Sequence, residues 1–375
     1  MRAVSRPPVP GAAVRDARPH GGPPLYQAAH GEPAAGWVSL HVFHQGSLDA
    51  LLVAAVLPLA RTLMAAGRVQ RCFFLRYWEG GPHLRLRLLP ASPDTGGQVQ
   101  RLAMDRMTDY LAAHPSPPPR MTQPQYDRVA ARFAGFEGRR TFDPLLHPCD
   151  SAQLIPYQRD CGAYGGQRPM AAFESHFTES SQIAGGLVAA EPGTARRAAY
   201  ALPMLAATVA ACDSDLRRAS DWFGSYAKTW SRGAAPVAAG ADKNTEAGFE
   251  RGYQRQRAAI LRTITSLWPA APGTGPGPRP AAGTPLAAWR RSVHNLRRRL
   301  VALHEDGLVA PLPAPPRLAA LGGAVPDGLR ASGPVLMLHC AHLMCNRLGV
   351  PAADEPYLQF LVARGLSDAA GGVTA

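Results

Sequence analysis

The sequence CFFLRYWEGGPHLRLRLL, residues 72–89, decides the fold of this chain. Two runs of bulky residues, 72–77 and 83–89, flank the turn Glu79-Gly-Gly-Pro82, and two strands joined by such a turn form a β-hairpin. Side chains alternate between the faces of a strand, so Leu84, Leu86 and Leu88 share one face. The segment therefore predicts an antiparallel hairpin whose leucine face packs on a core.

The other face of the second strand is the first candidate site. It carries His83, Arg85 and Arg87, with neighbours about 6–7 Å apart along the strand. An imidazole and two guanidiniums in this arrangement suit the binding of a carboxylate or of developing negative charge. The spacing leaves a second interpretation open, in which this face is the ordinary solvent-facing surface of an antiparallel sheet.

The flanking sequence predicts an α+β fold, with an antiparallel or mixed sheet in the N-terminal half and a mostly helical C-terminal half. Residues 37–44 alternate as a strand does, and Asp49 is expected to cap a helix over 50–66 that stops at Gly67. A helix is expected over 97–114, followed by short strands over 123–132 and 152–158. Further along the chain, apolar residues repeat with helical spacing, which predicts helices over 170–187, 195–211, 214–229, 244–267, 285–304, 332–348 and 354–365.

We expect a single catalytic domain over residues 36–367. The first 35 residues are rich in Pro, Gly and Ala and show no period, which predicts a disordered arm over 1–35. Residues 269–285 hold many Gly and Pro and predict a loop within the domain. Residues 368–375 are expected to form a flexible tail.

The charge of the chain indicates an acidic partner. Its 375 residues include 40 Lys and Arg against 27 Asp and Glu, a formal charge of +13. An excess made almost wholly of arginine suits acidic groups. The densest run, Arg290 to Arg299, has no interleaved aromatic residues and is typical of a solvated helix face, so nucleic acid is not the expected partner.

The remaining composition indicates a cytoplasmic protein without a metal. The six cysteines form no CxxC pair, so neither a zinc site nor a disulfide framework is expected. The longest apolar run, Ala50 to Ala60, is interrupted by Pro58 and predicts a buried helix rather than a membrane span. No secretion signal is recognised at the N-terminus.

Two further clusters carry groups capable of proton transfer. The segment 157–166 sets Tyr157, Asp160 and Tyr164 among glycines that permit a close backbone approach, although on its own this segment favours a structural turn between a strand and a helix. Near the C-terminus, His342 and Asn346 lie four residues apart and share a helical face. His342 is a candidate acid or base or an ordinary core histidine, and a metal is disfavoured because no third ligand is visible nearby.

In order along the chain, these motifs resemble the thiopeptide-type bacteriocin biosynthesis domain. The motifs that carry the resemblance are Trp37, Asp49-Ala-Leu-Leu52, Phe73-Phe-Leu-Arg-Tyr77, Gly81-Pro-His-Leu-Arg-Leu-Arg87, Tyr164-Gly-Gly166 and His342-Leu-Met-Cys-Asn-Arg-Leu-Gly349. In that family the domain is the elimination domain of lantibiotic dehydratases when fused, and a separate enzyme in thiopeptide pathways. The resemblance runs from about Trp37 to Leu361 and implies the same fold.

The family that this chain resembles contains two chemistries. Elimination enzymes remove glutamate from glutamylated Ser or Thr, and they carry both hairpin arginines, a Tyr-x-x-Glu-x-x-Arg-Tyr-Gly-Gly segment and the late histidine. Pyridine synthases join two dehydroalanines in a formal [4+2] cycloaddition and expel water and the leader peptide. Arg85, Arg87 and His342 of this chain match the pattern of the elimination enzymes. The chain has Asp160 where that pattern has Glu, and Ala163 where it has Arg.

The change at Ala163 favours the pyridine synthase. The missing arginine is a cation suited to a glutamyl carboxylate, and such a charge-assisted contact contributes roughly 1.5–3 kcal/mol. The resemblance then implies catalytic roles for His342, Tyr157, Tyr164 and Asp160, and substrate binding by Arg85, Arg87, His83 and Asn346. No cofactor is expected.

The implied partner is a precursor peptide with an acidic leader, together with other enzymes of its pathway. We expect the leader to dock away from the reacting residues, by adding to an exposed edge strand of the sheet. Two alternatives remain open from the sequence: a glutamate-eliminating enzyme, and a catalytically inactive domain that binds the leader as a scaffold.

Overall fold

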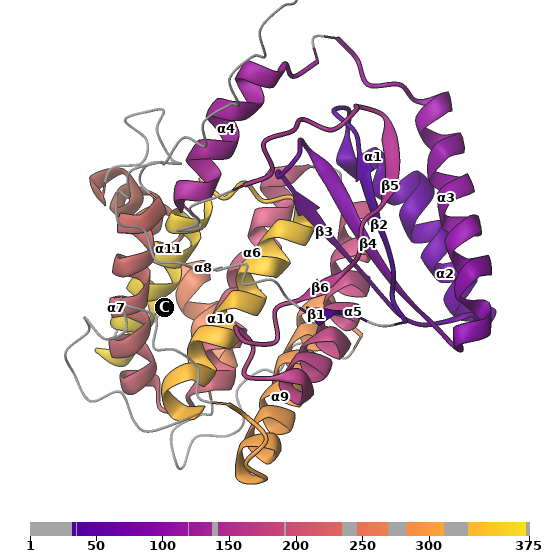
Figure 1. Cartoon of the computed structure of the whole chain (residues 1–375). Coiled ribbons are helices and arrows are strands. Elements are labelled where there is room, and N and C mark those ends of the chain that lie inside the picture. The colour runs from indigo at the N-terminus through magenta and orange to yellow at the C-terminus, as the bar shows by residue number, and fades with distance from the viewer. Residues whose placement is uncertain are drawn as a thin grey trace, which may run out of the picture.

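The computed structural model describes residues 32–34, 36–118, 120–136, 142–190, 193–234, 246–268, 283–310 and 329–372. These residues form an antiparallel sheet on one side and a layer of helices on the other (Figure 1). The sheet has the order β3-β4-β2-β5, built from β2 (Val38–Phe43), β3 (Val69–Tyr77), β4 (His83–Pro90) and β5 (Ser151–Leu154). The predicted α+β architecture is confirmed.

The hairpin of β3 and β4 forms as predicted, and its register places the site. Leu84, Leu86 and Leu88 are fully buried on the core face of the sheet. On the other face, β2 pairs with β4 so that His41 lies opposite Arg85 and Ser39 opposite Arg87. Residues that lie directly opposite each other in paired strands point to the same face of a sheet. The polar residues of β2 therefore lie on the same face as those of β4.

Helices cover the core face of the sheet. α1 (Leu48–Leu51), the π-helical turn η1 (Leu52–Val56) and α2 (Leu57–Ala65) run in sequence, and α3 (Gly96–Ala113) lies beside them (Figure 1). The cap of α1 is Ser47, whose hydroxyl accepts the N–H of Ala50, so the prediction that Asp49 caps this helix is wrong. Asp49 lies in the first turn, where ion pairs with Arg76 and Arg197 hold it.

One helical stretch, Leu48–Ala65, has the length and apolar character needed to cross a membrane. Its side chains Leu51, Leu52, Val56 and Leu63 are buried in the core between the helix and the sheet. One side of the helix therefore packs on the core as predicted, and 33% of the stretch is buried.

The helical layer follows the predicted periods closely. It consists of α5 (Gln167–Ala190), α6 (Thr194–Cys212), α7 (Leu216–Ala234), α8 (Glu246–Leu267), α9 (Pro285–Glu305), α10 (Leu329–Leu348) and α11 (Glu355–Ala370). Trp289 lies fully buried between α9 and α6, and its indole N–H donates to the Met204 carbonyl at 2.8 Å. A buried aromatic ring with a satisfied N–H fixes these two helices against each other.

The expected strand over 123–132 is wrong, because this segment is the helix α4 (Gln123–Phe136). Tyr126, Ala130 and Ala134 are its buried residues, and their spacing of four is helical. Two alanines give only a weak apolar signal, so the helical period is hard to see in the sequence.

The domain limits also need correction at both ends. Glu32–Pro33 forms β1, which pairs with β6 (Gln158–Arg159), so the expected arm is wrong at these residues; 1–31 lie outside the described part. At the other end α11 continues to Ala370, and Asp368 binds Arg257 at 2.8 Å, so the expected tail does not start at 368. Of the predicted loop over 269–285, only 283–285 are described, and Pro285 begins α9.

The edge of the sheet at β3 is closed by side chains from the helical layer. The Phe74 N–H donates to the Ser181 hydroxyl at 3.2 Å, and the Arg347 guanidinium donates to the Phe74 carbonyl at 3.1 Å. Asn346 accepts the Arg76 N–H at 3.0 Å and donates to the Arg76 carbonyl at 2.8 Å. Since these backbone groups are already paired, β3 does not offer an exposed edge, and β5 is the other edge strand of this sheet.

Asp150 ties the loop after α3 to the end of β2. Its carboxylate accepts the hydroxyl of Ser116 at 2.5 Å and the N–H of the same residue at 2.9 Å, and it contacts His44 Nδ1 at 2.8 Å. Burial alone would raise the pKa of Asp150. The hydrogen bonds from Ser116 and His44 outweigh it and lower that pKa from 3.8 to about 2.

We expect Asp150→Asn to lower the free energy of unfolding at pH 7 by about 1–2 kcal/mol, allowing for the partial solvent screening of this carboxylate. The folded pKa lies below the unfolded one, so this stabilisation is complete above about pH 4 and is lost as the pH falls toward 2. Urea unfolding at pH 7 and pH 3 checks the prediction, with exposed Asp94→Asn as the control. The prediction would be contradicted if Asp150→Asn differed from wild type in free energy of unfolding by the same amount at pH 7 and pH 3.

Candidate active site

The polar face of the sheet is covered rather than open to solvent. His41 is 6% exposed, His83 is 0% exposed and Arg87 is 5% exposed. The interpretation of this face as an ordinary solvent surface is therefore wrong. Burying cationic side chains is costly, which makes this face a candidate site.

The imidazoles and guanidiniums of this face form one hydrogen-bonded group, which we call the hairpin cluster: His41, His83, Arg85 and Arg87. His83 Nδ1 lies 2.9 Å from the Gly81 carbonyl and therefore carries the proton, which leaves Nε2 to accept from Arg85 Nε at 3.2 Å. Arg87 Nη2 lies 3.0 Å from His41 Nε2, and the rings of His41 and His83 stack with centroids 4.8 Å apart.

The hairpin cluster carries a net positive charge at neutral pH. Burial and the charge of Arg85 lower the pKa of His83 to about 3, and the same two causes lower the pKa of His41. Burial, then Arg85, lowers the pKa of Arg87 to about 9, so this guanidinium stays charged at pH 7. The cluster thus presents two cations and two neutral rings.

Glu79 and two tyrosines complete the surroundings of the hairpin cluster. Arg85 stacks on the ring of Tyr77 at 3.5 Å, and its Nη2 lies 3.6 Å from the Glu79 carboxylate. Arg87 lies over the ring of Tyr157 at 5.2 Å. Two guanidiniums side by side on one strand are suited to hold an anion or an oxygen that gains negative charge.

Of the glycine segment, only Tyr157 reaches the hairpin cluster. Tyr164 is buried against Phe173 and Phe177 in the helical layer. Asp160 is half-buried in the turn before α5, where its carboxylate accepts the Ala163 N–H at 3.2 Å. Burial raises the pKa of Asp160, which makes it a better proton donor than an exposed aspartate.

Arg159 does not replace the cation that is missing at Ala163. Its guanidinium makes two short hydrogen bonds, at 2.6 and 2.7 Å, to the carboxylate of Glu174 on α5. Glu174 is fully buried, so this bidentate pair is a fixed part of the core. The neighbouring arginine is therefore occupied, and Ala163 itself packs against the core.

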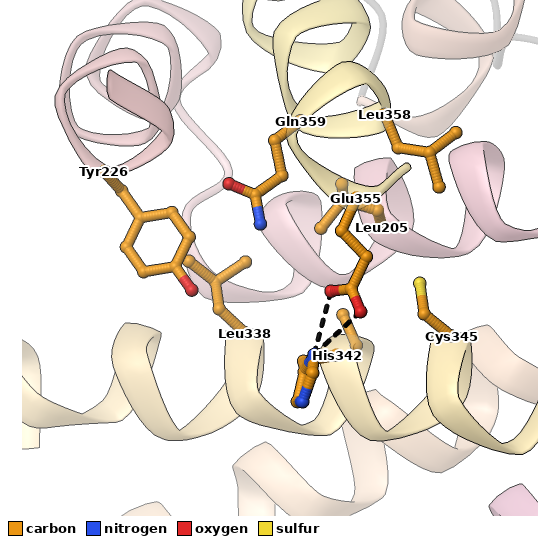
Figure 2. A pocket seen from close by; sticks show the side chains of 9 residues that line it. Leu205, Tyr226, Leu338, His342, Cys345, Glu355, Leu358 and Gln359 are labelled. Carbon is orange, nitrogen blue, oxygen red and sulfur yellow. Dashed lines mark hydrogen bonds and ion pairs between the residues drawn. The ribbon is translucent and has the colours of Figure 1, made fainter. Parts of the chain in front are cut away.

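His342 lies in a separate recess between α10 and α11 (Figure 2). Its Nδ1 lies 2.8 Å from one carboxylate oxygen of Glu355 and 3.0 Å from the other. Figure 2 shows the second ring nitrogen pointing away from that carboxylate. The other residues of the recess are Leu205, Tyr226, Leu338, Ala341, Cys345, Leu358 and Gln359. A histidine oriented by a buried glutamate is the arrangement of an acid–base group.

Aromatic rings connect the recess with the hairpin cluster. Tyr157 packs edge-on to Phe73 at 5.8 Å, and Phe73 packs on Phe177 at 5.5 Å. Phe177 contacts Tyr164, which in turn lies 5.9 Å from His339 beside His342. The structure thus separates the hairpin cluster from His342, with an aromatic layer between them that includes Tyr164.

The sequence as a whole matches the family model described as the lantibiotic biosynthesis dehydratase C-terminal domain, over residues 37–366. The chain belongs to this family. The match covers the sheet and nearly all of the helical layer, so it includes the hairpin cluster and the recess of His342.

Solved structures with the fold of this dehydratase C-terminal family agree. The pyridine synthase TbtD from thiomuracin biosynthesis is 19% identical with a TM-score of 0.67, covering 89% of this chain and 99% of its own. TsrL is 19% identical with a TM-score of 0.56, over 90% and 97%. The tRNA-dependent lantibiotic dehydratase MibB from Microbispora sp. 107891 is 17% identical with a TM-score of 0.51, over 91% of this chain and 28% of its own. No curated protein matches. These likenesses support the fold.

Two residues of the hairpin cluster region were not predicted from the sequence: His41 and Glu79. His41 alternates with Leu40 and Val42, which placed it on a polar face, but only the pairing of β2 with β4 brings it to Arg87. Among the residues that the structure describes, no group of three or more His, Cys, Asp or Glu is arranged to hold a metal.

Asn346, predicted to bind substrate, joins α10 to the sheet in the structure. Both ends of its amide pair with the backbone of Arg76. We expect Asn346→Ala to lower the free energy of unfolding by about 1–3 kcal/mol, because two backbone groups lose their partner. Urea unfolding measures this, with Asn295→Ala on α9 as a control. A large loss of kcat in a variant of unchanged stability would instead support a role in substrate binding.

Proposed function

We propose that this member of the dehydratase C-terminal family forms the central pyridine of a thiopeptide from two dehydroalanines. The observation that carries the proposal is the loss of the carboxylate-binding cation in the glycine segment. Ala163 stands at its position, and Arg159 is occupied by Glu174. A reaction that expels glutamate requires that contact, whereas ring formation from two dehydroalanines handles no glutamyl ester.

The proposed reaction is balanced without an oxidant. One dehydroalanine and the imidic-acid form of its neighbouring amide supply four atoms of the ring, and the second dehydroalanine supplies two. Two carbon–carbon bonds form, and the ring then loses water and the leader as its carboxamide. These two eliminations leave the aromatic pyridine, so no cofactor enters the proposal.

The hairpin cluster is suited to the first stage of this reaction. Holding both dehydroalanines at bonding distance supplies much of the required barrier reduction. The charged guanidiniums of Arg85 and Arg87 stabilise the amide oxygen as it gains negative charge, and the neutral rings of His41 and His83 keep them in place. Tyr157 lies beside Arg87 and is the nearest of the predicted proton-transfer groups.

The eliminations require an acid and a base. His342, oriented by Glu355, and Asp160, whose pKa is raised by burial, are our candidates, with Tyr164 in a supporting position next to His339. The partner is then the precursor peptide, modified beforehand by other enzymes of the pathway. We place the enzyme in the cytoplasm, where these peptides are made.

A second candidate, glutamate elimination, is favoured by the net positive charge of the hairpin cluster, which also fits a glutamyl carboxylate. Intact-mass spectrometry separates the two. The enzyme alone is incubated with a leader-bearing, azole-containing peptide that holds two dehydroalanines, and separately with a glutamylated peptide.

We expect release of the leader carboxamide and a core peptide lighter by the leader and one water. Release of glutamate from the second peptide, with no change in the first, would overturn the proposal in favour of elimination. No reaction with either peptide, combined with binding of the leader, would favour the inactive scaffold.

A further inference from the structure

His147 lies beside the hairpin cluster, in the segment that leads into β5. Its ring stacks on Phe43 with centroids 4.5 Å apart, and Phe43 in turn lies 4.5 Å from the ring of His83. Phe43 is buried and lies opposite His83 in the pairing of β2 with β4, so both are on the polar face of the sheet. Burial and Arg85 come first among the causes that lower the pKa of His83, and His147 adds to them.

The glycines of the hairpin turn make room for this histidine. Gly80 has φ +80°, and a Cβ at this residue would lie 2.4 Å from Cδ2 of the His147 ring. The His147 N–H also donates to the Gly80 carbonyl at 2.8 Å. At the next residue, a Cβ on Gly81 would lie 2.8 Å from the side chain of Leu146. The two glycines therefore let residues 146 and 147 pack directly on the turn that precedes His83.

Asp143 orients the His147 ring. Its Oδ2 lies 2.9 Å from His147 Nε2, and its Oδ1 accepts the Leu145 N–H at 2.9 Å. The backbone of Asp143 is held as well, because its N–H donates to Glu79 at 3.1 Å and its carbonyl accepts the Tyr126 hydroxyl at 2.5 Å. An ionised carboxylate only accepts hydrogen bonds, so Nε2 carries the proton of the neutral His147 ring and Nδ1 keeps the lone pair.

Two other described histidines contact a carboxylate, and they are placed differently. His44 is 3% exposed and packs on Tyr110 of α3, on the helical side of the sheet. His342 lies in its own recess, beyond the aromatic layer. The His147 side chain is 21% exposed, so its ring has access to solvent as well as to the cluster. A histidine with this access, oriented by a carboxylate, is suited to exchange protons with a bound molecule.

We propose that His147, oriented by Asp143, is the proton-transfer group of the hairpin cluster. Its Nδ1 takes the N–H proton of a substrate amide whose oxygen is held by Arg85 and Arg87. The same proton then passes from Nδ1 to that oxygen, which gives the imidic acid and restores the neutral ring. One proton moves from nitrogen to oxygen and nothing is oxidised, so the step is balanced. The identity of this amide rests on the proposed function.

The test removes the ring and supplies it again. His147→Ala deletes the proton-transfer group and leaves space beside the glycine turn, whereas His147→Gln keeps a side chain that can donate to Asp143. We expect both variants to lower kcat for leader-carboxamide release by roughly 10²-fold, since a positioned acid–base group contributes this much. Added imidazole is expected to raise kcat of His147→Ala about tenfold and to leave His147→Gln unchanged.

The rescue separates proton transfer from a structural role. With imidazoles of different basicity, the rescued rate is expected to follow the basicity of the added ring. The matched control is His114→Ala, because His114 also stacks on an aromatic ring, that of Tyr110, and its Nδ1 contacts a backbone carbonyl. This control is expected to keep wild-type kcat with and without imidazole. Wild-type kcat in a folded His147→Gln enzyme, or equal rescue by every imidazole, would overturn the inference.

A measurement without substrate separates this inference from the proposed function. The tautomer of His147 is read from long-range ¹H–¹⁵N correlation spectra of histidine-labelled protein, with the signal assigned by its loss in His147→Gln. We expect the neutral ring to carry its proton on Nε2, and Asp143→Ala to abolish this preference. A neutral ring protonated at Nδ1 in the wild type would overturn the inference whichever peptide reacts.

The two substrates complete the separation. Protonation of His147 at Nε2 with no reaction of either peptide would overturn the proposed function alone. If the wild type released only glutamate, from the glutamylated peptide, the proposed function would fail. The proton-transfer role of His147 would then stand if its variants lost that activity with the same imidazole rescue, and would be overturned if they kept it.

Discussion

Replacing Arg87 by glutamine is expected to lower kcat for ring formation by roughly 10²–10³-fold. The buried guanidinium of Arg87 is held by His41 at 3.0 Å and remains charged at neutral pH. Glutamine keeps a donor at that position but removes the positive charge. The change is read from initial rates of leader-carboxamide release.

Two further variants separate this charge effect from a general loss of structure. Arg87→Lys keeps the positive charge but lacks the planar guanidinium. We expect its kcat to be about tenfold higher than that of Arg87→Gln. Arg101→Gln changes an exposed arginine on α3 and is expected to match wild type. The thermal unfolding midpoint of each variant controls for folding. A folded Arg87→Gln enzyme with wild-type kcat would remove the hairpin cluster from the reaction.

His342→Asn is expected to lower kcat by roughly 10²-fold or more, because a positioned acid–base group contributes this much. Its partner gives a second, more specific readout. Glu355 is buried and contacts Nδ1 of His342 at 2.8 Å, so it holds the imidazole in one orientation. Glu355→Gln keeps a polar side chain at this position without the charge, and we expect it to lower kcat about tenfold, less than His342→Asn does.

The control for these variants is His294→Asn, a change of an exposed histidine on α9. If His342→Asn kept wild-type kcat in a folded protein, the recess would be structural and the proton transfers would belong to Tyr157 beside Arg87. If Glu355→Gln changed stability but not kcat, the pair would link α10 to α11 without acting on substrate.

Much of the fold is predictable because its signals are local. The alternation of Leu84, Leu86 and Leu88 and the turn after Glu79 define the hairpin without reference to distant residues. Long helical periods likewise place α5 to α11 to within a few residues. Local signals are weak in α4, where alanines mark the buried side, and in β1, whose two residues are a strand only because β6 pairs with them.

The site is less predictable because its contacts are distant in sequence. Arg85 and Arg87 are evident from their strand, but burial of that face and its link to His41 depend on the register of β2 with β4. His342 is visible as a candidate, whereas its pairing with Glu355 requires the turn between α10 and α11. Asn346 is a further case, since this polar residue pairs with the backbone of Arg76, a contact that the sequence does not indicate.

The closed edge of β3 has a consequence for how the chain is made. The partners of the Arg76 backbone lie 270 residues later, on α10, and the Ser181 hydroxyl that pairs with Phe74 lies 107 residues later. During synthesis from the ribosome, β3 can pair with β4 at once, but its outer edge stays unpaired until nearly the whole chain has emerged. An unpaired strand edge of this kind joins other chains readily, so a chain that stalls before α10 is exposed to aggregation in a way that the finished protein is not.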